Sequence, residues 1–276
     1  MTRLDGAAVL ITGGASGIGA ETGWQAASRG ARVALLDLDG DAAATRAAGL
    51  PGGPHLGLAA DVTDSAALTA AVGRVVAAFG GIDVVVANAG IGEAGTVATR
   101  PVEDLLRTVD INLSGAVRTA HATLPHLVER RGYLLLVSSA AALKNVPGGS
   151  CYAASKAGVE AFGGALRLEV AHRGVAVGVA HPAWVRTPMF AAQTRSAAFN
   201  EGLARLPWPF DVVSSVEDCG AAFVRGIERR QRKIYVPEAL RYVDKVRGVF
   251  TGALWDRVVG LRAKDTVPAM EREAAR

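Results

Sequence analysis

The chain has 276 residues, half of them hydrophobic and a fifth charged, and its net charge is +4. A chain of this length can bury one large core, and so small a charge excess is weak evidence for nucleic-acid binding, so we expect one domain and no nucleic-acid partner. The chain has two cysteines, scattered histidines and no apolar stretch near the ~18 residues of a membrane span, which favours a cytoplasmic protein without a disulfide framework or a metal site.

Seven short apolar runs predict β-strands. Their apolarity is continuous rather than alternating, as in a parallel sheet that helices cover on both faces. Longer segments with helical spacing separate them, so we predict a single-domain α/β protein of the Rossmann type, with a doubly wound, mostly parallel seven-stranded sheet. The strands are expected at 7–12, 31–37, 55–61, 82–88, 132–139, 175–182 and 233–237, and the helices at 17–29, 64–79, about 101–130, 151–172 and 216–229.

The first predicted strand runs into the glycine-rich sequence TGGASGIG, where Gly13, Gly17 and Gly19 open the first helix. Glycines let the backbone approach a diphosphate closely, and a helix N-terminus offers unpaired N–H groups. The spacing differs from the commonest Rossmann fingerprint, and such turns also serve plain strand-to-helix packing. We expect this turn, including Ser16 and Ile18, to bind a dinucleotide cofactor.

Asp37 ends the second predicted strand, at the position where a carboxylate can accept hydrogen bonds from the adenosine ribose. A carboxylate there would repel a 2′-phosphate, and the following residues, LDGD, include no arginine or lysine to hold one. The sequence therefore favours NAD over NADP. The alternative is that Asp37 caps the next helix.

Tyr152 and Lys156 are four residues apart in a predicted helix, and so share one face of it. A phenol titrates near ~10 and becomes a useful general base only if its pKa is lowered. Lys156 can hold positive charge near Tyr152 and favour its phenolate. A tyrosine and a lysine at this spacing also occur by chance.

Four motifs taken together resemble one family: TGGASGIG, NAG at 88–90, Ser139 thirteen residues before Tyr152, and YAASK at 152–156. The chain resembles the short-chain dehydrogenase/reductases of the main Tyr-Lys type over roughly residues 5–238. The resemblance implies an NAD(H)-dependent oxidoreductase that interconverts a secondary alcohol and a ketone.

The same resemblance implies a role for each matching residue. Tyr152 would be the acid/base, and Lys156 would lower its pKa and hold the nicotinamide ribose. Ser139 would hydrogen-bond the substrate oxygen. Asn112 would hold a relay water, or alternatively stabilise a helix kink. The remaining cofactor contacts would come from Asp61 and Val62 at the adenine, Asn88 and Gly90 beside the ribose, and Pro182, Val185 and Thr187 at the nicotinamide amide.

Two positions depart from the family pattern. Ala87 stands where a first Asn is usual, which weakens a hydrogen bond that ties the sheet. Ala183 stands where a Gly usually follows Pro182, and its Cβ would narrow the site or demand a different backbone angle. Neither change removes a reacting group.

The substrate is expected under a long loop at 187–215. Its nearby residues are mostly apolar, which predicts a hydrophobic secondary alcohol or ketone. The alternative is a charged group recognised by Lys144 and Glu93. The predicted substrate residues are Leu143, Val146, Trp184, Met189 and Phe190.

We divide the chain into a catalytic domain at 1–238 and a C-terminal helical extension at 239–276. Gly163 and Gly164 give the helix at 151–172 a smooth face, which together with the resemblance predicts a homodimer or homotetramer. In the extension, an apolar stripe interleaved with basic residues predicts a helix packed on its own core or on a sister subunit. The alternative is peripheral contact with an anionic membrane through residues 240–262. The stripe consists of Leu240, Val243, Val246, Phe250, Leu254, Val258 and Leu261.

Two alternative functions remain open. One is an NADP(H)-linked carbonyl reductase, which Asp37 argues against. The other is a non-catalytic dinucleotide-sensing or scaffold protein of the same fold. Such proteins typically lose the reacting Tyr or Lys, whereas this chain retains Tyr152 and Lys156.

Overall fold

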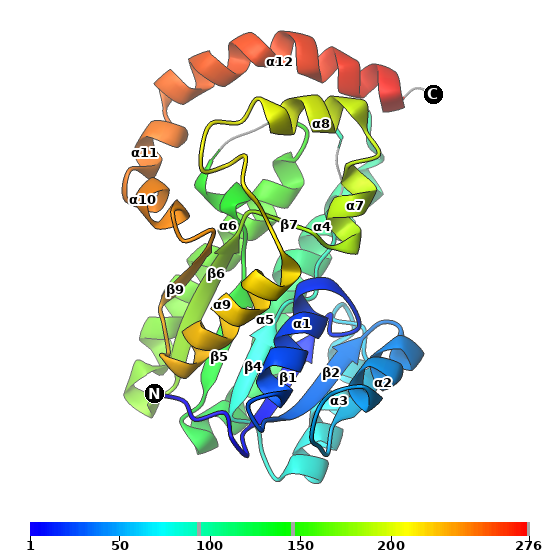
Figure 1. Cartoon of the computed structure of the whole chain (residues 1–276), viewed down its shortest axis with the longest axis vertical. Helices are drawn as coiled ribbons and strands as arrows, with labels where there is room; N and C mark the ends of the chain where they lie inside the picture. The colour runs from blue at the N-terminus through cyan, green and yellow to red at the C-terminus, as the bar shows by residue number, and fades with distance from the viewer. Residues whose placement is uncertain (93–94, 145–146, 275–276) are drawn as a thin grey trace.

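A parallel sheet of seven strands forms the centre of the molecule, in the order β3-β2-β1-β4-β5-β6-β9 (Figure 1). The computed structural model describes residues 1–92, 95–144 and 147–274, except for the side chains at 198, 250, 254, 258 and 262. Every pairing within this sheet is parallel, which confirms the predicted Rossmann-type α/β fold. The strands are β1 (Ala8–Thr12), β2 (Arg32–Asp37), β3 (Leu56–Ala59), β4 (Val84–Ala87), β5 (Tyr133–Val137), β6 (Ala176–Pro182) and β9 (Lys233–Val236).

The strand order reverses at β1, which pairs with β2 on one side and with β4 on the other. Leu10 lies opposite Ala34 of β2 and Val85 of β4. In open sheets of this kind, ligands bind beyond the carboxyl ends of the strands at the reversal. The topology therefore places a ligand site beyond Thr12 and Ala87, where β1 and β4 end.

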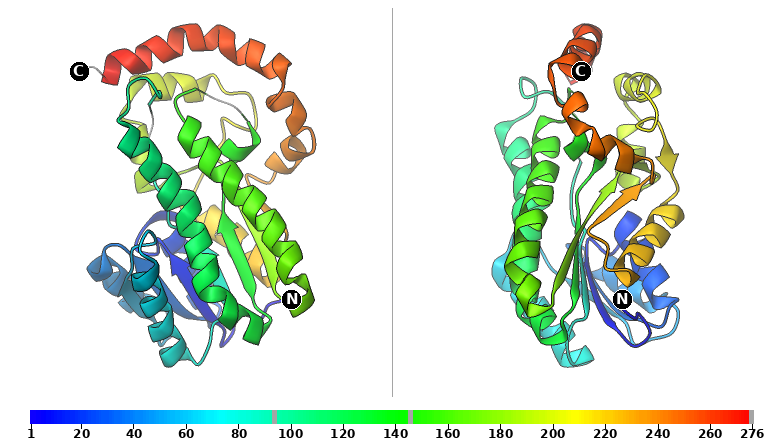
Figure 2. Two further views of the ribbon diagram at one scale, coloured as in Figure 1. Left: turned by 180° about the vertical axis from the view of Figure 1, so that it is seen from behind. Right: turned by 90° about the vertical axis from the view of Figure 1, so that its left-hand side faces the viewer.

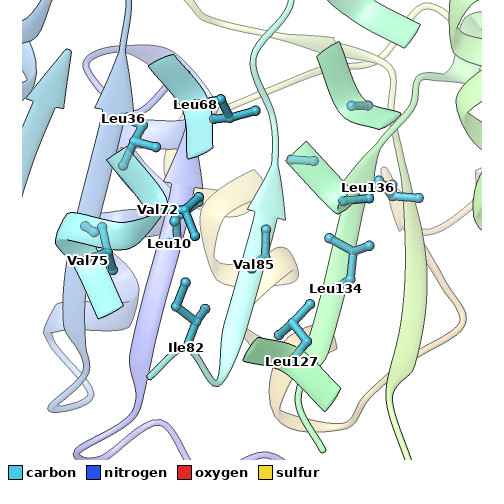
Figure 3. Packing of buried hydrophobic residues seen from close by; sticks show 14 of the residues in the cluster. Leu10, Leu36, Leu68, Val72, Val75, Ile82, Val85, Leu127, Leu134 and Leu136 are labelled. Atoms are coloured by element: carbon cyan, nitrogen blue, oxygen red, sulfur yellow. The ribbon is translucent and has the colours of Figure 1, made fainter. Parts of the chain in front are cut away.

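Helices cover both faces of the sheet (Figure 2). Because side chains alternate along a strand, Leu10, Val85 and Leu134 belong to a core under α3, α5 and α6 (Figure 3). Their neighbours Val9 and Val84 belong to a second core, under α1 and α9. The strands are thus apolar on both faces, as the continuous runs predicted. The helices are α1 (Gly17–Ala27), α3 (Ser65–Phe79), α5 (Gly115–Arg130), α6 (Ser150–Val170) and α9 (Val216–Glu228).

The helix predicted at about 101–130 contains a π-helical turn. α4 (Val102–Val109) leads into the π-helix Asp110–Ser114, and α5 follows directly. A π turn inserts an extra residue into the helix and is frequent at functional sites. The turn places Asn112, which is buried, beside the reversal point of the sheet.

The segment after β6 is not the long loop that we predicted. It contains α7 (Pro188–Gln193) and α8 (Ala197–Ala204), and β7 (Trp184–Val185) pairs with β8 (Val213–Ser214). Each helix begins at a capping hydroxyl: Thr187 accepts from Phe190 N–H, and Ser196 accepts from Phe199 N–H. The prediction missed both helices because they are too short for a clear periodicity.

The C-terminal segment forms three helices, not one continuous stripe. They are α10 (Leu240–Lys245), α11 (Arg247–Phe250) and α12 (Ala253–Ala274), and α12 lies over α8 (Figures 1 and 2). Leu240 and Val243 are buried against Phe210, as a helix packed on its own core requires. Val246 and Leu261 are exposed. The side chains of Phe250, Leu254 and Val258 lie outside the described part of the chain.

Among the described residues, no helix is long and apolar enough to cross a membrane. Peripheral contact through 240–262 stays a prediction. α2 (Gly40–Ala48) completes the helices and packs on β2 and β3.

Candidate active site

The glycine-rich turn after β1 is held in place by Asn88 at the end of β4. Asn88 Nδ2 donates to the carbonyl oxygens of Thr12 and Gly13, at 3.1 and 3.0 Å. Gly13 has φ +64°, and a Cβ there would lie 2.8 Å from Ala89 Cα. Asn88 thus ties the two strand ends together despite Ala87, and the turn requires glycine at 13.

The N-terminus of α1 offers free donors toward this turn. Ser16 is the N-cap, but its side chain makes no capping hydrogen bond to α1 in the described structure. The first N–H groups of α1 therefore lack the side-chain acceptor that usually satisfies them. Such a terminus at a sheet reversal fits the diphosphate of a dinucleotide.

Asp37 contacts the glycine-rich turn directly. Its carboxylate accepts from the N–H of Ala15 at 3.0 Å and from the N–H of Asp39 at 3.3 Å. The alternative that Asp37 caps the next helix is wrong, because the cap of α2 is Asp39, which accepts from Ala42 N–H. Asp37 thus stands at the end of β2 beside the glycine-rich turn, and the ribose contact predicted for it stays a prediction.

Asp61 and Val62 follow β3, the neighbour of β2. Asp61 accepts from both the N–H and the hydroxyl of Thr63, each at 2.8 Å. These hydrogen bonds lower the pKa of the Asp61 carboxyl. Val62 is buried and lies under Gly115 of α5, where a Cβ would be 2.8 Å from Val62 Cγ2. Both residues are held rigidly on the predicted adenine side.

Tyr152 and Ser139 meet at the carboxyl end of β5. Ser139 is the N-cap of the 3-10 helix η2 (Ala140–Leu143), and its Oγ accepts from Ala141 N–H at 3.1 Å. The same hydroxyl donates to the carbonyl of Pro182 at 3.3 Å, and it lies close enough to the Tyr152 phenol to oppose the raising of that phenol's pKa by burial. The Ser139 hydroxyl, at the start of η2, and the Tyr152 phenol, on α6, therefore lie close together although they come from different elements.

Lys156 lies beneath this pair. Its Nζ donates to the carbonyl of Val137 at 3.0 Å and is 5.8 Å from the centroid of the Tyr152 ring. Burial lowers the pKa of Lys156 to about 8.

The expected lowering of the tyrosine pKa is not found. Burial raises the pKa of the Tyr152 phenol above its usual value, and the hydrogen bond with Ser139 opposes that shift. Desolvation disfavours the phenolate, while the Lys156 ammonium donates to Val137 rather than to the phenol. The side chains of the protein alone therefore do not favour the phenolate of Tyr152.

Asn112 connects the site to the loop after β4. Its Oδ1 accepts from Ile91 N–H at 2.8 Å, and its Nδ2 donates to Ile91 O and Ser155 Oγ, at 2.9 and 3.2 Å. Both amide hydrogens are thereby used, and one lone pair of Oδ1 remains. Asn112 also sits in the π turn, as its alternative role in a kink requires.

A cavity of about 750 Å³, here called the main cavity, adjoins these residues. Its walls are mostly apolar side chains from α7, α8 and α12. The predicted cofactor and catalytic residues on its wall are Ile18, Asn88, Gly90, Ser139, Tyr152, Lys156, Pro182, Val185 and Thr187. The predicted substrate residues on its wall are Trp184, Met189 and Phe190.

One predicted substrate residue was misplaced. Leu143 is fully buried in a small core cluster with Phe210 and Leu240, so it lies behind the cavity wall. The side chain points inward because Leu143 lies on the side of the short 3-10 helix η2 that packs on this cluster. Val146 and Glu93 lie outside the described residues. Ala183 packs against the same cluster, and its N–H donates to Val236 O at 2.7 Å.

The sequence analysis missed the wall that α12 provides. Trp255, Val259, Ala263, Thr266 and Met270 line the main cavity at intervals of three or four residues. This helical spacing could have predicted a cavity-lining face of the helix. It was missed because the predicted apolar stripe ran through the adjacent residues Leu254 and Val258.

Comparison with known proteins agrees with this geometry. The family model described as short chain dehydrogenase matches residues 7–198. The chain is 36% identical over 189 residues to a 2-dehydro-3-deoxy-L-rhamnonate dehydrogenase (NAD(+)) of Sphingomonas sp. (strain SKA58), covering 68% of this chain and 75% of that protein. It is 37% identical over 209 residues to a (-)-trans-carveol dehydrogenase of Rhodococcus erythropolis, covering 68% and 74%.

A solved structure is also similar. A short-chain type dehydrogenase/reductase from Mycobacterium marinum superposes with a TM-score of 0.76 at 27% identity, covering 84% of this chain and 94% of that chain. The chain therefore belongs to the short-chain dehydrogenase/reductase family, whose members are oxidoreductases that act on alcohol- or ketone-type substrates with nicotinamide dinucleotide cofactors.

Proposed function

We propose that this protein is an NAD(H)-dependent oxidoreductase that interconverts a secondary alcohol and a ketone on an apolar small molecule. The observation that carries the proposal is the meeting of Ser139, Tyr152 and Lys156 on the wall of one apolar cavity. This cavity adjoins the uncapped N-terminus of α1. A hydride acceptor would therefore lie beside the carbinol carbon of the substrate, and a proton acceptor beside its hydroxyl oxygen.

The cofactor would bind along the strand ends. A nicotinamide dinucleotide, when bound, accepts or supplies the hydride. The turn at 13–19 would hold its diphosphate, and Asp37 would accept from the adenosine ribose. Thr187 supports a nicotinamide position near this turn, because its Cγ2 lies 3.3 Å from a Cβ placed at Gly17. We propose NAD over NADP because no lysine or arginine occurs between Arg32 and Arg46 to hold a 2′-phosphate.

The proton steps would belong to three side chains. In ketone reduction, the Ser139 hydroxyl donates to the substrate oxygen and the Tyr152 phenol gives it a proton. The raised pKa of Tyr152 keeps the phenol protonated at neutral pH, which favours this direction. In alcohol oxidation the Tyr152 phenolate takes the proton of the substrate hydroxyl. The Lys156 ammonium stabilises this phenolate before the transfer. The relay role of Asn112 stays a proposal, for which the remaining lone pair of Oδ1 leaves room.

The cavity wall supports an apolar substrate. Trp184, Phe190 and Phe199 form an aromatic group, with the Trp184 and Phe199 ring centroids 5.2 Å apart. The two relatives are named for different substrates, a sugar acid and carveol, so the family alone does not define the substrate.

The deciding experiment is calorimetric titration of the purified protein with NADH and with NADPH, beside an Asp37→Ala variant. We expect the wild-type protein to bind NADH more tightly than NADPH. The Asp37→Ala variant should bind NADH more weakly and NADPH more tightly than the wild type does. Asp41→Ala is the matched control, because it removes a nearby exposed carboxylate at the start of α2. Secondary alcohols with NAD and ketones with NADH are then assayed for turnover.

The alternatives predict different results. Tighter NADPH binding would contradict our interpretation of Asp37 and favour a carbonyl reductase. Tight dinucleotide binding without turnover of any alcohol or ketone would favour the sensing or scaffold function.

We also propose a homo-oligomer that pairs through the outer face of α6. Ala157, Ala161 and Gly164 line a shallow pocket on this face, and Leu168 on the same helix is exposed. Gly163, in contrast, faces the core, because a Cβ there would lie 2.7 Å from Val179 Cγ2. The two adjacent glycines thus serve different purposes.

A further inference from the structure

Lys144 is a buried cation on the wall of the main cavity. Only 4% of the residue is exposed. It is the C-cap of η2, whose N-cap is Ser139. With a rise of ~2.0 Å per residue in a 3-10 helix, the two Cα atoms are about 10 Å apart. One small molecule can therefore touch both side chains.

Two aromatic rings hold the Lys144 ammonium. Its Nζ is 4.1 Å from the ring centroid of Phe210 and 5.9 Å from that of Trp184. Trp184 Nε1 donates to Phe210 O at 2.8 Å, which fixes the two residues relative to each other. Ring faces attract a cation but accept no conventional hydrogen bond from it. The two rings thus fix the position of the Lys144 ammonium, while its N–H groups remain available to a hydrogen-bond acceptor.

Among residues 1–92, 95–144 and 147–274, Lys144 has no carboxylate or hydrogen-bond acceptor as partner. The three other cations on the described wall are engaged: Arg100 binds Asp104 at 2.9 Å, Arg205 binds Glu201, and Lys156 donates to Val137 O at 3.0 Å. An ammonium buried without an anion is costly, and this burial lowers the pKa of Lys144 to about 7.

Within the described part of the chain, no neighbouring carboxylate offsets that burial. Glu160 and Asp244, which lie on elements next to η2, are both bound by Lys233, at 2.8 and 2.6 Å. Glu273, on the exposed end of α12, accepts from Ser196. The other titratable groups on these elements are Cys151, Tyr152, Lys156, Arg167 and Glu169 on α6, His181 on β6, Asp211 after Phe210, Arg241, Tyr242 and Lys245 on α10, and Asp256, Arg257, Lys264, Asp265, Glu271 and Arg272 on α12.

We propose that Lys144 binds the carboxylate of a substrate whose other end carries the reacting ketone or alcohol, joined by an apolar body. This inference rests on the proposed function and names its substrate class. One ammonium without a second free cation suits a monoanion, whereas a phosphate dianion is usually held by several donors. The carboxylate supplies the acceptor that Lys144 lacks, and the apolar wall contacts the body.

Carboxylate binding by Lys144 is coupled to a proton. A bound carboxylate raises the pKa of the ammonium, so the carboxylate binds with constant affinity from just above its own pKa up to pH about 7 and progressively more weakly above it. A neutral ester gains nothing from this charge. Lys144 would therefore act on KM and not on the proton transfer at Tyr152.

The test compares methyl ketones that end in a carboxylate, from levulinate upward in chain length, each with its methyl ester. Reduction is measured with the preferred cofactor at pH 6 and pH 9. At the best chain length and pH 6, we expect the KM of the acid to be about ten- to hundred-fold below that of its ester, as a charged hydrogen bond of ~1.5–3 kcal/mol gives. This preference should shrink at pH 9.

Variants of Lys144 separate charge from packing. Lys144→Met should remove the acid preference at every pH. Lys144→Arg should retain it and lose the pH dependence, because the guanidinium stays charged. Lys245→Met, on the exposed side of α10, is the control that should leave the ratio unchanged.

Calorimetry keeps this inference separate from the proposed function. Binding of the acid to the wild-type protein in two buffers of different ionisation enthalpy should show proton uptake at pH 8. Turnover of esters without any acid preference would overturn the role of Lys144 and leave the proposed function intact. If neither series is turned over, equal binding of acid and ester at pH 6 would overturn the role of Lys144 independently.

Discussion

The ammonium of Lys156 donates to the carbonyl oxygen of Val137 at 3.0 Å. The cation is therefore fixed by the last residue of β5, while its attraction to the Tyr152 phenol acts across 5.8 Å to the ring centroid. Both side chains are disfavoured in their charged forms, because burial raises the pKa of Tyr152 and lowers that of Lys156 to about 8. These opposite shifts define how the proposed enzyme should respond to pH.

We expect kcat/KM for ketone reduction to be level at neutral pH and to fall as pH rises through about 8, where Lys156 loses its proton. Tyr152 does not contribute in this range, since its pKa lies above the usual ~10. The Lys156→Arg variant should have a lower kcat/KM than the wild type, but its kcat/KM should not fall above pH about 8, because arginine stays charged. An unchanged midpoint in the arginine variant would assign the decline to another group.

Tyr152→Phe removes the proposed proton donor and little else from the site. We expect kcat to fall by about 10²–10⁴-fold, the usual contribution of general acid–base catalysis. The dissociation constant of NADH, measured by fluorescence, should change by far less. Tyr242→Phe, on an exposed residue of α10, is the control. Retention of more than a tenth of the wild-type kcat would argue against the role of Tyr152.

The fold and the reacting residues could be predicted because both depend on local patterns. Continuous apolar runs require strands covered on both faces, and the four-residue spacing of Tyr152 and Lys156 places them on one helix face. The direction of the Tyr152 pKa shift could not be predicted, because desolvation depends on the whole surrounding wall. The sequence shows which charges are near in the chain but not how much water remains.

Substrate-side residues were predicted less well for the same reason. Leu143 and Lys144 are adjacent, yet one is in the core and the other on the cavity wall. Adjacent side chains of a 3-10 helix point in different directions, so the orientation of this one turn against the core decides between them, and no apolar pattern of four residues encodes that orientation. The cavity-facing side of α12 likewise depends on where the chain bends after α11.

Gly13→Ala and Gly73→Ala should have opposite effects on stability. Gly13 has φ +64°, and its new Cβ would lie 2.8 Å from Ala89 Cα, so we expect a loss of ~1–3 kcal/mol and weaker NADH binding. Gly73 is exposed in α3 with nothing within 4 Å of a Cβ, so alanine there should add ~0.5–1 kcal/mol. Urea denaturation of both variants measures the two changes. Equal shifts of the same sign would contradict this account of the turn.

Ala263→Arg tests whether α12 forms part of the substrate site. Ala263 lines the main cavity, so an arginine there should raise the KM of apolar ketones at least tenfold while leaving the dissociation constant of NADH unchanged. Leu261→Arg is the matched control, because Leu261 is two residues away and 63% exposed. An equal rise of KM in both variants would indicate general damage to α12 rather than loss of a cavity contact.

Gly164→Arg tests the proposed interface on α6. Nothing lies within 4 Å of a Cβ at Gly164, so the fold of one subunit should tolerate the side chain. If two copies of α6 pack through this face, an arginine there would separate them, because close helix packing requires small residues at the contact. We expect light scattering at micromolar concentration to give an oligomer for the wild type and a monomer for Gly164→Arg. Gly73→Arg, on the exposed face of α3, should remain oligomeric. A wild-type monomer would refute the assembly, and an oligomeric Gly164→Arg variant would move the interface to another face.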